Sequence, residues 1–170
     1  MKKGKLILIV LVLLFSVGCD QVTKVAARTH LEGQPATSYF GDLFRLTYAE
    51  NSGAFLGMGS SLPDSVRLGM FVVFVCLALT VGLVWLFKRR EALSRPMVLA
   101  TTLMIGGGIG NLIDRVLFDG RVTDFMSMGV AGFRTGIFNV ADIWIMVGIG
   151  LMFFAPEFWR KPENVEAESS

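Results

Sequence analysis

Charged residues are scarce in this sequence. Asp, Glu, Lys and Arg together make up 18% of its 170 residues, whereas hydrophobic residues make up 53%. A water-soluble domain cannot place so much apolar material in its core, so this balance excludes an ordinary soluble protein and indicates a membrane protein. The formal net charge is only +2, and the basic residues cluster beside apolar runs, which argues against nucleic-acid binding.

Cysteine and histidine are equally scarce. The two cysteines, Cys19 and Cys76, lie in apolar surroundings with no partner at metal-ligand spacing, which argues against a disulfide framework and a zinc site. The single histidine, His30, has no nucleophile elbow or Cys/His pair near it, which argues against Ser-His-Asp or Cys-His catalysis. We therefore expect no metal and no cofactor, and any chemistry must come from other side chains.

Long apolar runs are abundant, and four of them predict transmembrane helices. Residues 68–87 form a run of twenty uncharged residues. Such a run crosses a hydrocarbon core of about 30 Å at about 1.5 Å per residue. The other spans are expected at about 6–27, 97–113 and 137–155. We predict an all-α membrane protein with four transmembrane helices in one integral membrane domain, residues 1–170.

The first run has a second interpretation. The segment LFSVGCDQVTK (14–24) follows a basic amino end and an aliphatic run, and it has the form of a lipoprotein cleavage site before Cys19. However, Ser16 stands where that motif usually has leucine, and Asp20 and Lys24 lie four residues apart, so they can neutralise each other inside a longer helix. We predict an uncleaved first span, with a lipoprotein as the alternative.

The basic residues predict the orientation. MKKGK (1–5), KRREALSR (88–95) and WRK (159–161) flank the spans, whereas the other connecting segments mix Arg with Asp and Glu. By the positive-inside rule both termini then face the cytoplasm. The segments 28–65 and 114–136 are expected on the outer side.

The first outer segment predicts a small β-sheet. Phe44, Leu46 and Tyr48 alternate with polar residues, the pattern of a short amphipathic strand lying on the bilayer surface. We expect this extracytoplasmic sheet to be accompanied by a short helix or loop. The acidic tail, residues 161–170, is expected to be disordered.

Two matching tetrads carry polar residues into the membrane: NLID (111–114) and NVAD (139–142). In a helix, Asn and Asp three residues apart share a face, so each amide can donate to its own carboxylate or to a neighbouring one. An Asp at mid-membrane costs about 2.5 to 3.5 kcal/mol, so such residues mark a pathway, a counter-ion or a catalytic group. The alternative is a buried polar network that only ties helices together. Asp20, Asp119 and Asp124 add further carboxyl groups at this depth.

Paired carboxylates without histidine or metal can hydrolyse a peptide bond. Two aspartates that share one proton supply a general acid and a general base together, and they titrate as a coupled pair. The competing use is proton or cation conduction. Transporters are commonly built from two repeated halves, and four helices without a second repeat would make a small transporter. A channel formed by several copies of the chain is kept as an alternative. At this level of argument the second aspartate of a pair stays undecided among Asp20, Asp114 and Asp124.

Five ordered blocks resemble the lipoprotein signal peptidases, also called signal peptidase II. The blocks are DQVTK (20–24), NSGAF (51–55), GNLIDR (110–115), VTDF (122–125) and FNVAD (138–142), within a resemblance over about residues 10–155. This family consists of four-helix aspartic peptidases of the bacterial inner membrane. They cleave the signal peptide of a prolipoprotein immediately before its diacylglyceryl-cysteine.

The resemblance implies a set of functional residues. Asp124 and Asp142 would be the catalytic pair near the periplasmic face. The supporting or substrate-binding residues would be Asp20, Lys24, Asn51, Gly53, Asn111, Asp114, Arg115 and Asn139. Asp114 is interpreted as a helix-end residue that holds the GNLIDR turn, and simple snorkelling to the interface is the alternative for Lys24 and Arg115.

The resemblance also implies partners. The protein would bind diacylglyceryl-prolipoproteins and membrane lipids, without nucleic acid, as a monomer. Substrate would enter from the bilayer between helices, and the outer segment 28–65 would cradle it. Two departures from the family pattern are mild: LGM follows NSGAF, and Thr123 stands where valine is common.

Overall fold

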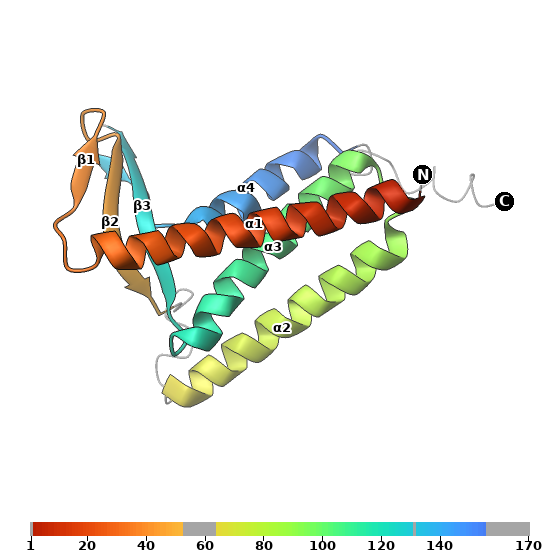
Figure 1. Ribbon diagram of the computed structural model, residues 1–170, viewed down its shortest axis with the longest axis horizontal. Coiled ribbons are helices and arrows are strands. Elements are labelled where there is room, and N and C mark those ends of the chain that lie inside the picture. The colour runs from red at the N-terminus through yellow and green to blue at the C-terminus, as the bar shows by residue number, and fades with distance from the viewer. Residues whose placement is uncertain (1, 53–63, 131, 156–170) are drawn as a thin grey trace.

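The structure is a computed structural model that describes residues 2–52, 64–130 and 132–155. The described residues form the helices α1 (Lys2–Leu31), α2 (Asp64–Arg89), α3 (Arg95–Leu117) and α4 (Val140–Phe153), and the strands β1 (Thr37–Tyr39), β2 (Phe44–Asn51), β3 (Val122–Val130) and β4 (Phe133–Arg134) (Figure 1). This mostly helical architecture with a small sheet confirms the predicted fold class.

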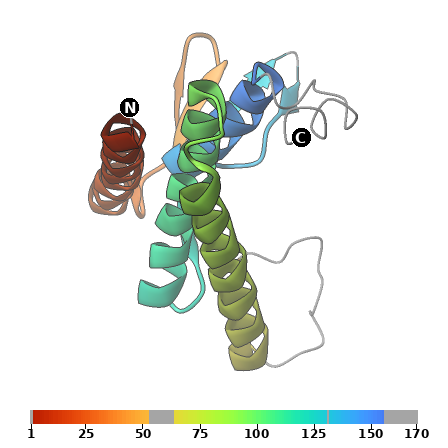
Figure 2. The same ribbon diagram turned by 90° about the vertical axis from the view of Figure 1, so that its right-hand side faces the viewer.

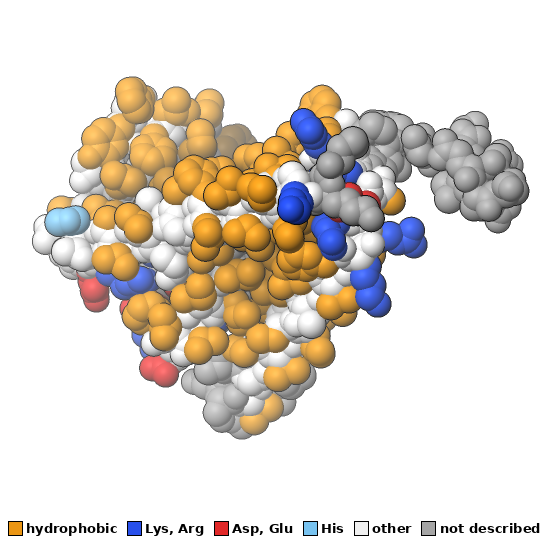
Figure 3. Space-filling model, turned by 45° about the vertical axis from the view of Figure 1, so that its right-hand side comes forward, with side chains coloured by type: hydrophobic (Ala, Val, Ile, Leu, Met, Phe, Trp, Pro, Cys, Tyr) orange, Lys and Arg blue, Asp and Glu red, His pale blue; other side chains and the backbone are white. Residues whose placement is uncertain are grey.

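Helix α3 is the centre of the helical bundle. It packs against each of α1, α2 and α4, and Figure 2 shows α1 and α4 on opposite sides of it. Ile9, Leu86, Val98 and Ile105 form the apolar core between α1, α2 and α3. Apolar side chains also cover most of the face in Figure 3, while basic side chains gather at one end. A surface of this kind suits lipid contact.

Three of the described helices, α1, α2 and α3, are long and apolar enough to cross a membrane. The predicted spans differ from them in extent. The first span, expected at 6–27, is the longer helix Lys2–Leu31, and the third, expected at 97–113, continues to Leu117. Both extensions carry charged residues that are paired inside the protein, Arg28 on α1 with Asp114 on α3, and this pairing between distant segments was not apparent from the sequence.

The fourth span is shorter than predicted. The sequence indicated a span over 137–155, but α4 is a helix of 14 residues, Val140–Phe153. Its start is set by Asn139, which caps the helix, and by Phe138, which forms a bridge with Met126 of β3. The bridge is a tertiary contact that the run of apolar letters did not reveal, whereas the cap is a local contact between Asn139 and Asp142. The predicted tail at 161–170 lies outside the described residues.

The sheet is antiparallel with the strand order β1-β2-β3-β4. The predicted strand over Phe44 to Tyr48 is confirmed as β2, but half of the sheet comes from the second outer segment, which the sequence left unassigned. Phe44 and Leu46 pack with Phe125 and Met126 against Ala27 of α1. This contact seats the sheet on the end of α1 that finishes at Leu31, here called the sheet end of the bundle (Figure 1). The accompanying short helix or loop was expected without stated bounds, and residues 53–63 of the first outer segment lie outside the described residues.

Candidate active site

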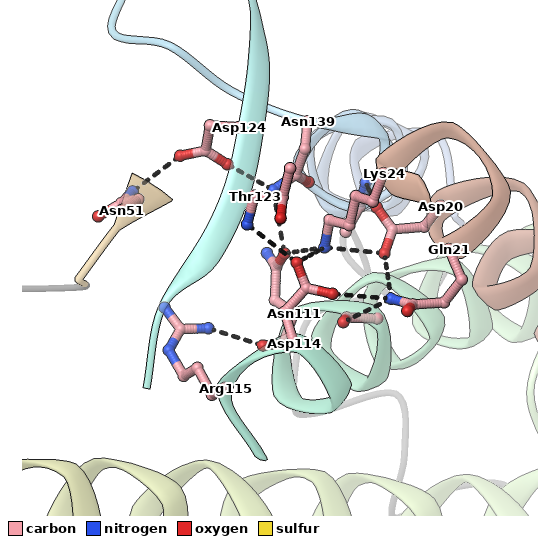
Figure 4. Close-up of polar contacts among 12 residues, drawn as sticks. Asp20, Gln21, Lys24, Asn51, Asn111, Asp114, Arg115, Thr123, Asp124 and Asn139 are labelled. Atoms are coloured by element: carbon pink, nitrogen blue, oxygen red, sulfur yellow. Dashed lines mark hydrogen bonds and ion pairs between the residues drawn. The ribbon is translucent and has the colours of Figure 1, made fainter. Parts of the chain in front are cut away.

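Asp124 lies in β3, where the sheet meets the helices. Residue 124 pairs with Ala49 across the ladder, so Asn51 at the end of β2 comes within reach of its carboxylate. The Asn51 Nδ2 donates to Asp124 Oδ2 at 2.9 Å, and Asn139 Nδ2 donates to Asp124 Oδ1 at 2.6 Å (Figure 4). With a side chain only 2% exposed, Asp124 is a buried carboxyl group whose two oxygens are both hydrogen-bonded.

Asp142 lies in the first turn of α4, held by a capping box. The backbone N–H of Asp142 donates to Asn139 Oδ1 at 3.1 Å, and the backbone N–H of Asn139 donates to Asp142 Oδ2 at 3.1 Å. A carboxylate is favoured at this position because the first-turn N–H groups carry partial positive charge. Asn139 and Asp142 of the NVAD tetrad are therefore three residues apart because they form the cap at the start of α4. The sequence had suggested instead that both lie on one face inside a helix.

Asn111 joins the two carboxyl groups through amide contacts. Its Nδ2 donates to Asp142 Oδ1 at 3.0 Å, while its Oδ1 accepts from Asn139 Nδ2 at 3.1 Å and from Lys24 Nζ at 2.9 Å. Because an ammonium group only donates, Lys24 holds the oxygen of Asn111 toward itself and leaves the NH₂ group for Asp142. Asn111 thus bonds across to the carboxylate of the other tetrad, one of the alternatives that the sequence left open.

Next to these amide contacts lies a buried cluster of charged side chains. Lys24 Nζ lies 2.9 Å from Asp20 Oδ2 and 3.4 Å from Asp114 Oδ2, with all three side chains 0% exposed. The Asp20–Lys24 pair that the sequence predicted is confirmed, but snorkelling of Lys24 is wrong, because its ammonium group points into the protein. Asp20 Oδ1 also accepts the backbone N–H of Ala141 at 2.9 Å, which ties α1 to the start of α4.

The side chains of Asp114 and Arg115, neighbours in the last turn of α3, have different partners. Asp114 Oδ2 accepts the backbone N–H of Thr123 at 2.9 Å, so it fastens the start of β3 as well as the helix end. The half-buried Arg115 donates to the carbonyl of Asn111 at 3.1 Å and interacts electrostatically with Asp124, Asp142 and Asp114. A snorkelling arginine would turn away from these groups. Gly53 lies outside the described residues.

The sequence analysis missed Gln21, which bridges two of the buried carboxylates. Its Nε2 donates to Asp20 Oδ2 at 3.1 Å and to Asp114 Oδ1 at 3.2 Å. It also donates to the carbonyl of Gly110 at 3.1 Å. A signal was present, because Gln21 is an uncharged polar residue directly beside Asp20 in an apolar helix. It was part of the DQVTK block but was given no role.

The electrostatics of the site distinguish the two carboxyl groups. Burial raises the pKa of Asp124 to about 6, with a smaller contribution in the same direction from Asp142, while the donors Asn51 and Asn139 oppose the rise. Asp142 is more accessible than Asp124, being half-buried. One carboxyl group that tends to keep a proton, beside one that solvent can reach, is the arrangement required for paired acid and base catalysis. Among the described residues no group of three His, Cys, Asp or Glu side chains could hold a metal ion.

An apolar groove leads away from Asp142 along α4. One wall is the α4 face at Ile143, Met146 and Val147. The opposite wall comes from Met128 and the segment 135–138. A molecule bound in this groove would therefore lie beside the Asp142 carboxylate.

Comparisons with known proteins agree on one family. A family model described as signal peptidase (SPase) II matches residues 10–157. A lipoprotein signal peptidase from a Sulfurihydrogenibium species is 34% identical to this chain over 142 residues, covering 84% of this chain and 86% of that protein. Another, from Hydrogenovibrio crunogenus, is 38% identical over 149 residues, covering 85% of this chain and 81% of that protein.

Solved structures resemble the chain over a similar extent. One described as "Bacterial membrane enzyme structure by the in meso method at 1.9 A resolution" superposes with a TM-score of 0.73 at 29% identity, covering 86% of this chain and 90% of that chain. A second, at 2.3 A resolution, gives a TM-score of 0.70 at 29% identity, covering 86% of this chain and 85% of that chain.

Proposed function

Because the chain belongs to the signal peptidase II family, we propose that it is an aspartic endopeptidase that cleaves diacylglyceryl-modified prolipoproteins immediately before the lipidated cysteine. The observation that carries the proposal is the pairing of Asp124 and Asp142. The two carboxyl groups share Asn139 as a hydrogen-bond partner and are close enough to interact electrostatically. A pair of this kind provides acid and base without any cofactor.

In the proposed mechanism the pair shares one proton. Burial favours that proton on Asp124, so the more accessible Asp142 is the base that removes a proton from the attacking water. The water oxygen bonds to the scissile carbonyl carbon, and Asp124 gives its proton to the developing tetrahedral oxyanion. In the collapse of this gem-diol the C–N bond breaks and the proton taken up by Asp142 passes to the leaving amine. One hydroxyl proton of the gem-diol returns to Asp124 as the carbonyl re-forms, which restores the singly protonated pair.

Arg115 and the amide network would position the reacting groups. The Arg115 guanidinium interacts with both carboxyl groups and is the cation that would offset negative charge as the tetrahedral intermediate forms. Asn111 and Asn139 hold the two carboxyl groups in place before substrate arrives, so no reorganisation is needed during the reaction.

The proposed setting is the bacterial inner membrane, with both termini in the cytoplasm and the site near the periplasmic face. The positive-inside rule supports it, because basic side chains gather at the end of the bundle opposite the sheet (Figure 3). The described ones are Lys3, Lys5, Lys88, Arg89, Arg90 and Arg95. The apolar groove beside Asp142 supports entry of the lipidated substrate from the bilayer. The groups of the pair come from one chain, so we expect a monomer to suffice.

The proposed function is tested with two precursor peptides that differ only in the diacylglyceryl group on the cysteine. The purified protein in detergent is expected to cleave the lipidated peptide and leave the other intact. Mass spectrometry of the products should show a new amino terminus at the lipidated cysteine. Equal cleavage of both peptides, or cleavage elsewhere, would contradict the proposed specificity. Proton or cation flux in proteoliposomes without any cleavage would favour the conducting alternative.

Activity is expected to fall on the alkaline side of about pH 6, because the buried Asp124 must keep its proton and its pKa is raised to about 6. The midpoint belongs to the coupled pair. Asn51 donates to the Asp124 carboxylate and favours the ionised form, so Asn51→Leu should raise the pKa further and move the alkaline limb of kcat to higher pH. A pH–rate profile measures this shift. A limb that stays in place or moves to lower pH would contradict the assignment.

Gly107 permits the close approach of α4 to α3. A Cβ at residue 107 would lie 2.4 Å from the Ala141 carbonyl oxygen, one residue before Asp142. Gly107→Ala should therefore displace the start of α4 and lower kcat by about tenfold to a hundredfold. The matched control is Gly150→Ala on α4, where a Cβ meets nothing within 4 Å. Equal kcat values for the two variants would show that the approach at Gly107 has no bearing on the pair.

A further inference from the structure

Arg28 contacts three residues that lie close together in the sequence. It is on α1, four residues beyond Lys24, and its side chain is 19% exposed. Its Nη1 donates to Thr123 Oγ1 at 2.6 Å and lies 3.7 Å from Asp114 Oδ2. The guanidinium carbon also lies 4.3 Å from the centre of the Phe118 ring, within the range of a cation–π contact. Asp114 lies in the last turn of α3, Phe118 directly follows that helix, and Thr123 is the second residue of β3, so the three partners span the connection between α3 and β3.

This connection determines where β3 begins. It turns through Asp119 and Gly120, which have φ angles of 50° and 85°, and the Gly120 N–H donates to the Arg115 carbonyl at 2.8 Å. Asp114 closes it by accepting the Thr123 N–H at 2.9 Å. Arg28 bonds to the residues at both ends of the loop, so it fastens the whole connection to α1.

Asp124 directly follows the residue that Arg28 holds. Successive side chains of a strand point to opposite faces, so a Thr123 side chain fixed toward α1 directs Asp124 the other way. On that other face Asp124 meets Asn51 and Asn139. We propose that Arg28, acting through the Thr123 hydroxyl, is a positioning residue that sets the place of Asp124. This inference rests on the proposed function, because it concerns the geometry of the same pair.

The Thr123 hydroxyl is the specific part of this contact. Threonine and valine have nearly the same shape, but valine offers no acceptor for the Arg28 N–H. Thr123 is 4% exposed, so water cannot readily replace the lost acceptor. The substitution Thr123→Val therefore removes the Arg28 contact without changing the volume of the strand residue.

The test is a double-mutant cycle measured on the lipidated precursor peptide. Arg28→Met and Thr123→Val should each lower kcat by about tenfold, with KM changed by less than about twofold, since the substrate still binds. The double variant should lose no more than Arg28→Met alone, about tenfold, because the hydrogen bond that Thr123→Val removes is already absent in Arg28→Met. The matched control is Thr29→Val, which removes only an exposed helix-internal hydrogen bond to the Val25 carbonyl and should leave kcat unchanged.

Two further measurements separate positioning from general support of the fold. If Asp124 moves away from Asn51 and Asn139, it loses donors that favour its ionised form, so Arg28→Met and Thr123→Val should raise the pKa of the pair. Infrared titration of the carboxyl groups measures that pKa without any turnover, and Arg28→Lys, which keeps a cationic donor, should restore most of the wild-type value. Thermal unfolding confirms that the variants are folded.

The inference is overturned if Arg28→Met and Thr123→Val leave both kcat and the carboxyl pKa at the wild-type values. It is also overturned if the double variant loses about a hundredfold, the product of two independent effects. Absence of cleavage by the wild-type protein would instead contradict the proposed function, and the infrared titration would still decide the role of Arg28.

Discussion

Asp124→Asn and Asp142→Asn are each expected to lower kcat for cleavage of the lipidated precursor by about 10⁴-fold, close to complete loss. An asparagine at either position cannot accept or release a proton. The two acids can then no longer share a proton. Without Asp142 the water is not activated, and without Asp124 the oxyanion is not protonated. Because the two residues act as a unit, the double variant should be no slower than either single variant. Single-turnover assays with excess protein measure residual rates at this level.

Asp119→Asn is the matched control for these substitutions. Asp119 is an exposed carboxylate in the turn between α3 and β3, and its φ of 50° is one that asparagine also adopts. The Asp119→Asn variant should cleave the lipidated precursor at the wild-type rate. Normal cleavage by either the Asp124 or the Asp142 variant would end the assignment of the pair, whereas loss in all three variants would point to a general effect of removing negative charge near the sheet.

The sequence predicted the parts of the site that depend on short-range spacing. Asp20 and Lys24, four residues apart on α1, form the expected pair. The two tetrads also supply neighbouring asparagines and aspartates. The contact that joins them, Asn111 to Asp142, depends on how α3 and α4 approach each other at Gly107, which no local pattern encodes.

The choice of Asp124 illustrates the same limit. The sequence offered Asp20 and Asp114 as alternatives to Asp124, and only the family resemblance selected Asp124. Its contacts depend on the register between β2 and β3, which places Asn51 opposite Val122, and on the bulge between Leu46 and Ala49. Sheet register between segments more than seventy residues apart is set by tertiary packing, so it could not be derived from periodicity.

Arg28 was missed for a related reason. It lies beyond the predicted end of the first span, where an arginine is typically interpreted as an interfacial side chain. The partners that give it a role, Thr123, Asp114 and Phe118, come from a segment about ninety residues later. Thr123 was noted only as a mild departure from the family pattern.

Lys24→Met is expected to have the largest effect on stability, lowering the free energy of unfolding by about 3 to 5 kcal/mol. Lys24 is fully buried between Asp20 and Asp114, and it also donates to Asn111. The substitution leaves Asp20 without its ion pair, while Asp114 keeps Arg28 and an electrostatic interaction with Arg115. It also frees the Asn111 amide to turn its oxygen toward Asp142, which would disturb the pair. We expect a lower unfolding midpoint in detergent and almost no cleavage by the folded fraction.

A second substitution tests whether charge balance is the cause. In Lys24→Met combined with Asp20→Asn, the cluster regains one positive and one negative group, Arg28 and Asp114, so part of the lost stability should return. Activity should not return, because Asn111 still lacks the donor that orients its amide. Lys88→Met, at an exposed position near the end of α2, is the matched control and should unfold at the wild-type midpoint. If the double variant is less stable than Lys24→Met alone, packing around the lysine stem, and not its charge, is what stabilises the cluster.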